Sequence, residues 1–409
     1  MTNLLWPGDH RAGDLMTDEA LLATMVAVES AWLNALVGAG LAPVEAADAD
    51  LGRLLDAQDC EVLAAGAEDG GNPVTGLVAL LRERAAPALS AWIHRGLTSQ
   101  DVLDTSLMLA ARDVADMLKS QLSEQISTLS TLARTYRATP MVARTLTQHA
   151  VPTTFGAKVA GWLNSVIDAY RSLDAMTWPA QIGGAGGTLA ATTELATLAG
   201  HHDGPAHVSI QLAQSTSAAL GLANRMPWHT TRTPITALGD ALVGCTDAWG
   251  RIASDIVTLA RPEIAELSEP AAGDRGGSST MPGKRNPVLS ILLRRTAMSA
   301  PQLAATLHIA AALAHDERPD GAWHAEWDTL RTLARRTVVA AAQCSELLVG
   351  LEIHPGRMAE NLDTADVAGE QRAIADLAES TPSPTYFGTV DFLIDDSLNR
   401  AQRFLKERR

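Results

Sequence analysis

Cysteine and aromatic residues are scarce in this sequence, and each shortage excludes a class of protein. Only three cysteines occur among the 409 residues, and Cys60, Cys245 and Cys344 lie far apart with no C-x-x-C pair. This spacing fits a reducing compartment and offers no zinc site, so we expect a cytoplasmic protein. Aromatic residues make up only 4% of the chain, and long Ala-, Leu- and Val-rich stretches favour helix over sheet.

Basic residues are also in short supply, because 32 Lys and Arg face 47 Asp and Glu and leave a net charge of −15. Nucleic acids and anionic membranes are therefore not expected as partners, since both require clustered cations. An anionic substrate would need a locally positive pocket. No run of eighteen apolar residues occurs, and residues 1–9 lack the features of a signal peptide, so we expect neither a membrane span nor a cleaved leader.

Long apolar stripes at helical spacing are the most regular feature that is present. Apolar residues recur three and four positions apart from Val114 to Tyr136 and from Leu238 to Leu259, and a shorter stripe runs from Val159 to Leu173. Each stripe is typical of one face of an amphipathic helix. Two further helical patterns cover residues 286–313 and 323–351. Together these stripes predict an all-α protein built around a long-helix bundle.

The length of the chain exceeds what one hydrophobic core usually supports, so more than one region is expected. We predict a small N-terminal helical domain at 1–104 and a central long-helix bundle domain at 105–345, which carries a distinctive loop at 273–287. A short C-terminal helical region follows at 346–409. The long helices have more apolar surface than a single bundle can bury, which favours a homotetramer with a central multi-helix core.

The distinctive loop concentrates residue types that can close over an anion. Glycines at 276, 277 and 283 permit backbone geometries that other residues avoid, while prolines at 282 and 287 stiffen the segment. Between them lie two hydroxyls, a cation and an amide, supplied by Ser278, Ser279, Lys284 and Asn286. A plain surface turn rich in Gly and Ser would account for residues 276–279, but not for the Met, Pro, Lys, Asn and Pro that follow in order.

This loop resembles the GSSxMPxKxNP signature of the fumarase/aspartase superfamily, whose members make or break a bond beta to a carboxylate through an enolate-like intermediate. The resemblance implies that Ser278 gives or takes the proton alpha to a carboxylate, with Ser279 as the alternative hydroxyl. Lys284 and Asn286 would stabilise the doubly charged carboxylate of the intermediate. The resemblance also implies a homotetramer in which each active site draws on segments from three chains.

A segment from His94 to Thr105 resembles another active-site region of the superfamily. Thr98 and Ser99 can donate hydroxyl and backbone hydrogen bonds to a substrate carboxylate at the start of the following helix, where the helix dipole also favours an anion. The alternative interpretation is an ordinary N-cap, with Asp101 in the first turn. His94 is a candidate substrate contact and equally a candidate structural histidine.

The segment from Ala143 to Gly156 resembles the third region and departs from most relatives. Its candidate substrate contacts are Arg144, Thr145 and Gln148. Most relatives have R-T-H here, and the His serves or orients the general acid for the leaving group, whereas this chain has Leu146. No imidazole can protonate a leaving group at this position, which disfavours departure of an amine or amide.

A nonpolar residue at that position, often Trp, is typical of 3-carboxy-cis,cis-muconate cycloisomerase, the family that the whole pattern resembles. Stretches 181–189, 227–232 and 321–327 are similar to the same family. The remaining candidates for gripping a tricarboxylate are Arg232 and Arg285, with Met281 in the signature as a further contact. Each arginine, Arg144 included, could instead belong to a structural ion pair.

The resemblance therefore implies a cofactor-free and metal-free enzyme of aromatic catabolism that converts 3-carboxy-cis,cis-muconate, a small polycarboxylate, into carboxymuconolactone. A carboxylate nucleophile needs no activation, and its departure in reverse needs no strong acid, which is compatible with Leu146. Two alternatives stay open. One is a beta-eliminating lyase on another substituted succinate, such as nitrosuccinate, giving fumarate. The other is a non-catalytic helical scaffold with the same fold.

Overall fold

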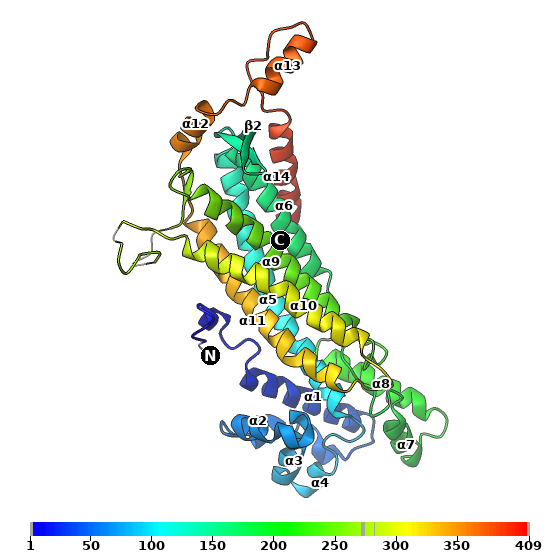
Figure 1. The fold of residues 1–409 in the computed structure, drawn as a ribbon. Helices are drawn as coiled ribbons and strands as arrows, with labels where there is room; N and C mark the ends of the chain where they lie inside the picture. The colour runs from blue at the N-terminus through cyan, green and yellow to red at the C-terminus, as the bar shows by residue number, and fades with distance from the viewer. Residues whose placement is uncertain (1–2, 271–274, 282, 407–409) are drawn as a thin grey trace.

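Long helices lie side by side along the molecule and form a central bundle (Figure 1). The structure is a computed structural model that describes residues 3–270, 275–281 and 283–406. The bundle helices are α5 (Ser99–Thr135), α6 (Phe155–Asp174), α9 (Thr233–Leu259), α10 (Val288–Ala312) and α11 (Gly321–Val349). In the signature loop at 273–287, residues 273, 274 and 282 lie outside the described residues.

The side chains of the three predicted stripes form the interior of this bundle. Leu118, Leu122 and Ile126 of α5 are fully buried, as are Trp162 of α6 and Trp249 of α9. Burial of such a side chain stabilises the fold by roughly 1.5–3 kcal/mol, so the stripes determine which face of each helix turns inward. The predicted long-helix bundle is confirmed.

Most of the shorter helices gather at the end of the bundle where α5 begins, at the bottom of Figure 1, whereas the short helix at Asp9–Ala12 packs against α11. The elements before α5 are η1 (Asp9–Ala12), α1 (Asp18–Gly38), η2 (Val44–Ala46), η3 (Leu51–Leu54), α2 (Asp59–Gly70), α3 (Pro73–Arg84) and α4 (Pro87–Ser90). Between α6 and α9 the chain adds α7 (Ala190–Leu198) and α8 (Pro205–Ala219). The boundary predicted after residue 104 falls within α5, and the division into domains stays a prediction.

Helix α1 is long and apolar enough to cross a membrane by length and composition alone. Within the protein it packs against α5 and α8, and Trp32 and Leu33 on its inner face are fully buried. These contacts are those of a core helix. The expected cytoplasmic location stays a prediction.

Small elements also surround the other end of the bundle. They are the antiparallel strands β1 (Pro140–Thr145) and β2 (Gln148–Thr154), the strands β3 (Leu267–Ser268) and β4 (Glu352–Ile353), and the helices α12 (Pro355–Asp363), α13 (Gly369–Leu377) and α14 (Val390–Lys406). None of these strands was expected from the sequence. In the β1–β2 hairpin, the tip residues Leu146 and Thr147 have φ of 49° and 72°, values usually taken by Gly or Asn, so the ordinary turn signal is missing.

Candidate functional site

The start of α5 is fixed by a capping box. The side chain of Thr98 accepts a hydrogen bond from the backbone of Asp101, and the carboxylate of Asp101 accepts one from the Thr98 backbone N–H at 3.0 Å. The two groups satisfy donors that a helix start leaves unpaired. The N-cap interpretation of this segment therefore fits the structure, and Ser99 beside it is half-buried. Whether either hydroxyl also binds substrate stays a prediction.

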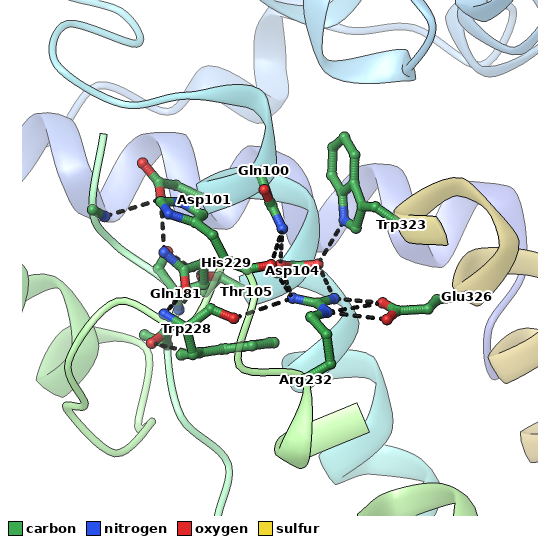
Figure 2. Close-up of polar contacts among 12 residues, drawn as sticks. Gln100, Asp101, Asp104, Thr105, Gln181, Trp228, His229, Arg232, Trp323 and Glu326 are labelled. Atoms are coloured by element: carbon green, nitrogen blue, oxygen red, sulfur yellow. Dashed lines mark hydrogen bonds and ion pairs between the residues drawn. The ribbon is translucent and has the colours of Figure 1, made fainter. Parts of the chain in front are cut away.

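Asp101 does more than cap the helix, because its buried carboxylate is the centre of a polar cluster (Figure 2). Its donors are the backbone N–H groups of Thr98, Gly183 and Gly184, the amide of Gln181 and the Nε2 of His229. These bonds attach the glycine-rich segment 183–187 to the start of α5. The imidazole of His229 fits closely there, since a Cβ on Gly183 would lie 2.9 Å from its ring.

Arg232 is completely buried beside this cluster and lies between two carboxylates (Figure 2). Its guanidinium donates to Asp104 at 2.7 and 3.0 Å and to Glu326 at 2.5 to 3.1 Å. Burial raises the pKa of the Glu326 carboxyl, and the ion pair with Arg232 partly offsets this rise. Burial alone would lower the pKa of Arg232, but Asp104 and Glu326 raise it. Of the two interpretations open for Arg232, this geometry favours the structural ion pair.

Two residues that the sequence analysis did not single out contact the first candidate segment. The Nδ1 of His94 forms a hydrogen bond of 2.6 Å with the carboxylate of Glu29, which is buried on the apolar helix α1. Arg318 contacts the hydroxyl of Thr98 through its guanidinium. The sequence signal that could have identified Glu29 is a lone Glu within an otherwise apolar helical stretch. The cation of Arg318 makes the start of α5 more favourable for an anion.

The second candidate segment forms the β1–β2 hairpin. Arg144 on β1 makes a bidentate ion pair with the buried carboxylate of Glu266, with N–O distances of 2.6 and 3.0 Å. Thr145 and Gln148 are exposed on either side of the turn. Leu146 is 95% exposed at the tip of the hairpin. The hairpin therefore presents an apolar side chain, and no acid, at its outermost point.

The signature loop stands away from the bundle, at the left of Figure 1. The Ser278 hydroxyl accepts hydrogen bonds from the backbone N–H groups of Thr280 and Met281 at 3.4 and 3.2 Å. Ser279, Lys284 and Arg285 are exposed, and Met281 is half-exposed. Backbone N–H groups that point at the Ser278 oxygen favour its ionised form.

The two ends of this loop meet at a narrow neck. Asn286 donates from its backbone N–H and from its side-chain amide to the carbonyl of Gly276, at 2.8 and 3.0 Å. Gly276 has φ of 78°, and a Cβ there would lie 2.5 Å from the Asn286 carbonyl oxygen. In this arrangement the Asn286 amide closes the neck, and Asn286 also lines a cavity of about 290 Å³ together with Arg275 and Arg285.

A carboxylate on α11 holds the foot of the loop. Glu346 accepts from Arg275 at 2.5 Å and from Arg11 of η1 at 2.7 Å. Burial would raise the pKa of Glu346, but the two guanidiniums lower it below its usual value. Glu269 fixes the other side by accepting the backbone N–H groups of Leu289 and Ser290 at the start of α10. The loop thus leaves the bundle at a defined place.

The candidate segments do not come together within one chain. Thr98 precedes α5 and the β1–β2 hairpin follows it, so the 37 residues of this helix separate them. At the α-helical rise this is a distance of about 55 Å. The signature loop leaves the bundle between these two ends (Figure 1). Within the described ranges, no group of three His, Cys, Asp or Glu side chains is placed to hold a metal ion.

Comparisons with known proteins agree on the kind of protein that carries these segments. A family model described as Lyase matches residues 16–301. A nitrosuccinate lyase from Streptomyces davaonensis is 44% identical over 85% of this chain and 74% of its own length. A 3-carboxy-cis,cis-muconate cycloisomerase from Bradyrhizobium diazoefficiens is 38% identical over 85% of this chain and 75% of its own. The crystal structure of a 3-carboxy-cis,cis-muconate lactonizing enzyme from Pseudomonas putida superposes with a TM-score of 0.80 at 30% identity, covering 97% of this chain and 86% of that one.

Proposed function

The chain belongs to the lyase family of the fumarase/aspartase superfamily, and we propose that this enzyme is a 3-carboxy-cis,cis-muconate cycloisomerase. Leu146 at the exposed tip of the β1–β2 hairpin supports a reaction that needs no acid there, and among such reactions the similarity to proteins named cycloisomerase and lactonizing enzyme carries this proposal. A reaction at this site must proceed without a general acid from that position. Addition of a carboxylate oxygen to a double bond meets this condition, because the nucleophile is already ionised and its departure in reverse requires no proton.

In the proposed chemistry, residues of the signature loop stabilise the intermediate and protonate one carbon of the substrate. A carboxylate oxygen of the substrate bonds to one carbon of the diene, and the electron pair of the attacked double bond moves into a neighbouring carboxylate. Lys284 and the loop N–H groups stabilise the resulting dianionic carboxylate. Ser278 then delivers its hydroxyl proton to the carbon alpha to that carboxylate, and the serine is reprotonated before the next turnover. No cofactor or metal takes part in these steps.

The proposal includes a homotetramer whose active sites combine segments from three chains. Two observations support it. The roughly 55 Å length of α5 prevents Thr98 and the hairpin of one chain from reaching the same substrate. Helix α10 leaves large apolar side chains exposed along its length, at Ile291, Met298, Ile309 and Leu313 (the last just past its end). Such a stripe is typical of a face that is buried on association.

A second substrate is supported by one specific finding. The relative that is 44% identical over 85% of this chain is named a nitrosuccinate lyase. Loss of nitrite from nitrosuccinate would give fumarate, and nitrite also departs without protonation. Leu146 is therefore compatible with both substrates, and the same Ser278 would remove the alpha proton in the elimination.

The deciding experiment offers both substrates to the purified protein and follows the ultraviolet absorbance. With 3-carboxy-cis,cis-muconate we expect rapid loss of the diene band, abolished in Ser278→Ala and retained in part in Ser279→Ala. Fumarate from nitrosuccinate, with no loss of the diene, would replace the first substrate by the second. A folded protein that turns over neither substrate would overturn both proposals and favour the scaffold. Size measurement by light scattering tests the tetramer in the same samples.

A further inference from the structure

Two arginines converge on one indole ring near the start of the chain, and none of the three side chains belongs to a candidate segment. The guanidinium carbon of Arg295 on α10 lies 3.6 Å from the ring centroid of Trp6, and that of Arg336 on α11 lies 4.0 Å from it. Cation–π attraction stabilises each contact. Two like charges on one ring nevertheless repel each other, and among the described residues only Arg336 has carboxylates near enough to offset this, namely Asp328 and Asp9.

Several hydrogen-bond donors of this cluster lack an acceptor. The Nε1 of Trp6 and the Nε and Nη1 of Arg295 are buried, and the part of the chain that the structure describes offers them no hydrogen-bond partner. All of these atoms are donors. The contact of Arg295 Nη2 with the Pro7 carbonyl is long, at 3.5 Å. Native proteins leave few buried polar groups unpaired, and a group of unpaired donors indicates an acceptor that completes them.

Neighbouring arginines, unlike Arg295 and Arg336, form ion pairs with carboxylates. Arg331 pairs with Asp18 at 2.6 Å, and Arg335 with Asp9 at 3.2 Å. Across the described residues, neither Arg295 nor Arg336 forms an ion pair within 4.0 Å of a carboxylate. Burial lowers the pKa of both guanidiniums, Arg336 adds to the effect on Arg295, and Asp328 and Asp9 partly offset it at Arg336. The cluster therefore holds positive charge in excess within a protein whose net charge is −15.

A cavity of about 430 Å³ opens on this cluster. Its walls include Trp6 and Arg336, and Arg295 contacts the Trp6 ring that forms the wall. Asp9 and Asp328 also line the cavity. Asp9 is paired with Arg335. Asp328 forms no ion pair within 4.0 Å among the described residues, but it acts on Arg336 electrostatically and weakens the attraction for an anion.

We propose that this space, the Trp6 cavity, binds a small oxyanion, either a carboxylate or a phosphate. The anion contacts the Arg336 guanidinium directly and accepts from the Trp6 and Arg295 donors after a tilt of the indole ring. Oxygen acceptors with negative charge supply the hydrogen-bond acceptors that these donors lack and offset the repulsion between the two guanidiniums. The proposal does not depend on which substrate the enzyme turns over.

The test measures the thermal midpoint and the heat of binding with two probes, inorganic phosphate and tricarballylate, at constant ionic strength set with chloride. Wild type should show saturable binding of at least one probe. Arg295→Gln and Arg336→Gln should each weaken it about tenfold or more. Trp6→Phe keeps the ring and removes the donor, so it should weaken binding less. Asp328→Asn should strengthen binding several-fold.

Arg294→Gln is the matched control, because Arg294 is the exposed neighbour of Arg295 and carries the same charge. This variant should bind the probes as wild type does. A preference for tricarballylate identifies a carboxylate ligand, and a preference for phosphate identifies a phosphate. Binding that Arg294→Gln weakens as much as Arg295→Gln would reveal only general attraction and overturn the site. The proposal also fails if neither probe binds wild type while Arg295→Gln changes the subunit number, because the missing acceptor then comes from a second copy of the chain.

Discussion

Arg144 and Glu266 form a bidentate ion pair that ties the β1–β2 hairpin to the segment entering β3. Glu266 is fully buried, and the side-chain amide of Asn361 donates to the same carboxylate at 2.8 Å. The pair fixes where the hairpin leaves the bundle. A candidate substrate contact in the sequence is thus occupied by a partner of its own chain.

Arg144→Met tests whether this pair is structural. The change leaves the buried Glu266 carboxylate without its cation, so we expect a loss of unfolding free energy of about 3 kcal/mol. Urea denaturation at neutral pH measures this loss. Adding Glu266→Gln to Arg144→Met should recover part of it, since no buried charge is then left. Unchanged stability together with a raised KM would instead assign Arg144 to the substrate.

The neck of the signature loop predicts a contrast between two glycines. Gly276→Ala forces a Cβ to within 2.5 Å of the Asn286 carbonyl oxygen at φ of 78°. A left-handed conformation alone costs about 1–2 kcal/mol for a residue with a Cβ, so we expect kcat/KM to fall about tenfold or more. Gly283→Ala meets no atom of the described residues within 4 Å and should change kcat/KM little. Equal losses in the two variants would show that the neck does not position the loop.

Glu346 predicts a pH dependence at the loop foot. Arg11 and Arg275 hold its folded-state pKa below the ordinary value of 4.5. A carboxylate with a lowered pKa stabilises the fold above that value, and this stabilisation is lost as the pH falls further. The thermal midpoint of Glu346→Gln should therefore lie below that of wild type at pH 7 and approach it on acidification below about 4.5.

The exposed Glu124 on α5 supplies the control for Glu346. Glu124→Gln should leave both the midpoint and kcat nearly unchanged at every pH. Glu346→Gln should also lower kcat several-fold, because a loosened foot no longer places Ser278 correctly. A midpoint difference between wild type and Glu346→Gln that stays constant from pH 7 to pH 3 would contradict the role of the two guanidiniums.

Leu146→His places an imidazole at the tip of the hairpin. The side chain is 95% exposed, so we expect the unfolding free energy to change by no more than about 0.5 kcal/mol. Under the proposed function, the new acid should increase elimination of a basic leaving group such as an amine, measured as fumarate from aspartate-like substrates. Leu146→Asn, which accepts the same backbone angles but cannot protonate, is the control. Equal rates for the two variants would show that the tip does not reach a substrate.

The bundle could be predicted from the sequence because its helices are long and their apolar spacing is regular. The stripe from Val114 to Tyr136 lies almost entirely in α5, and Leu238 to Leu259 in α9, which ends just before Pro262. The β1–β2 hairpin could not be predicted in the same way. Its strands are short, and its turn uses Leu146 and Thr147 where a left-handed turn usually has Gly or Asn.

The partners of the candidate site residues were the least predictable part. Arg232 and Asp104 are 128 positions apart, and Arg144 and Glu266 are 122 apart. A local sequence pattern carries no information on such distant pairs. The role of each arginine, in substrate binding or in an ion pair, could therefore not be decided from the sequence. The signature loop was easier to find, because its residues are contiguous.

The 37 residues of α5 set the distance and the relative rotation between the two ends of the molecule. Inserting one residue near its middle would turn everything beyond it by about 100° and advance it by about 1.5 Å. Leu122 and Ile126 would then leave the core together, and the hairpin would point in a new direction. Changes of side chain in α5 can be absorbed one at a time, whereas a change of its length cannot. Insertions and deletions should therefore be far rarer along this helix than substitutions. The length of α5 should change less between related chains than its amino-acid identities.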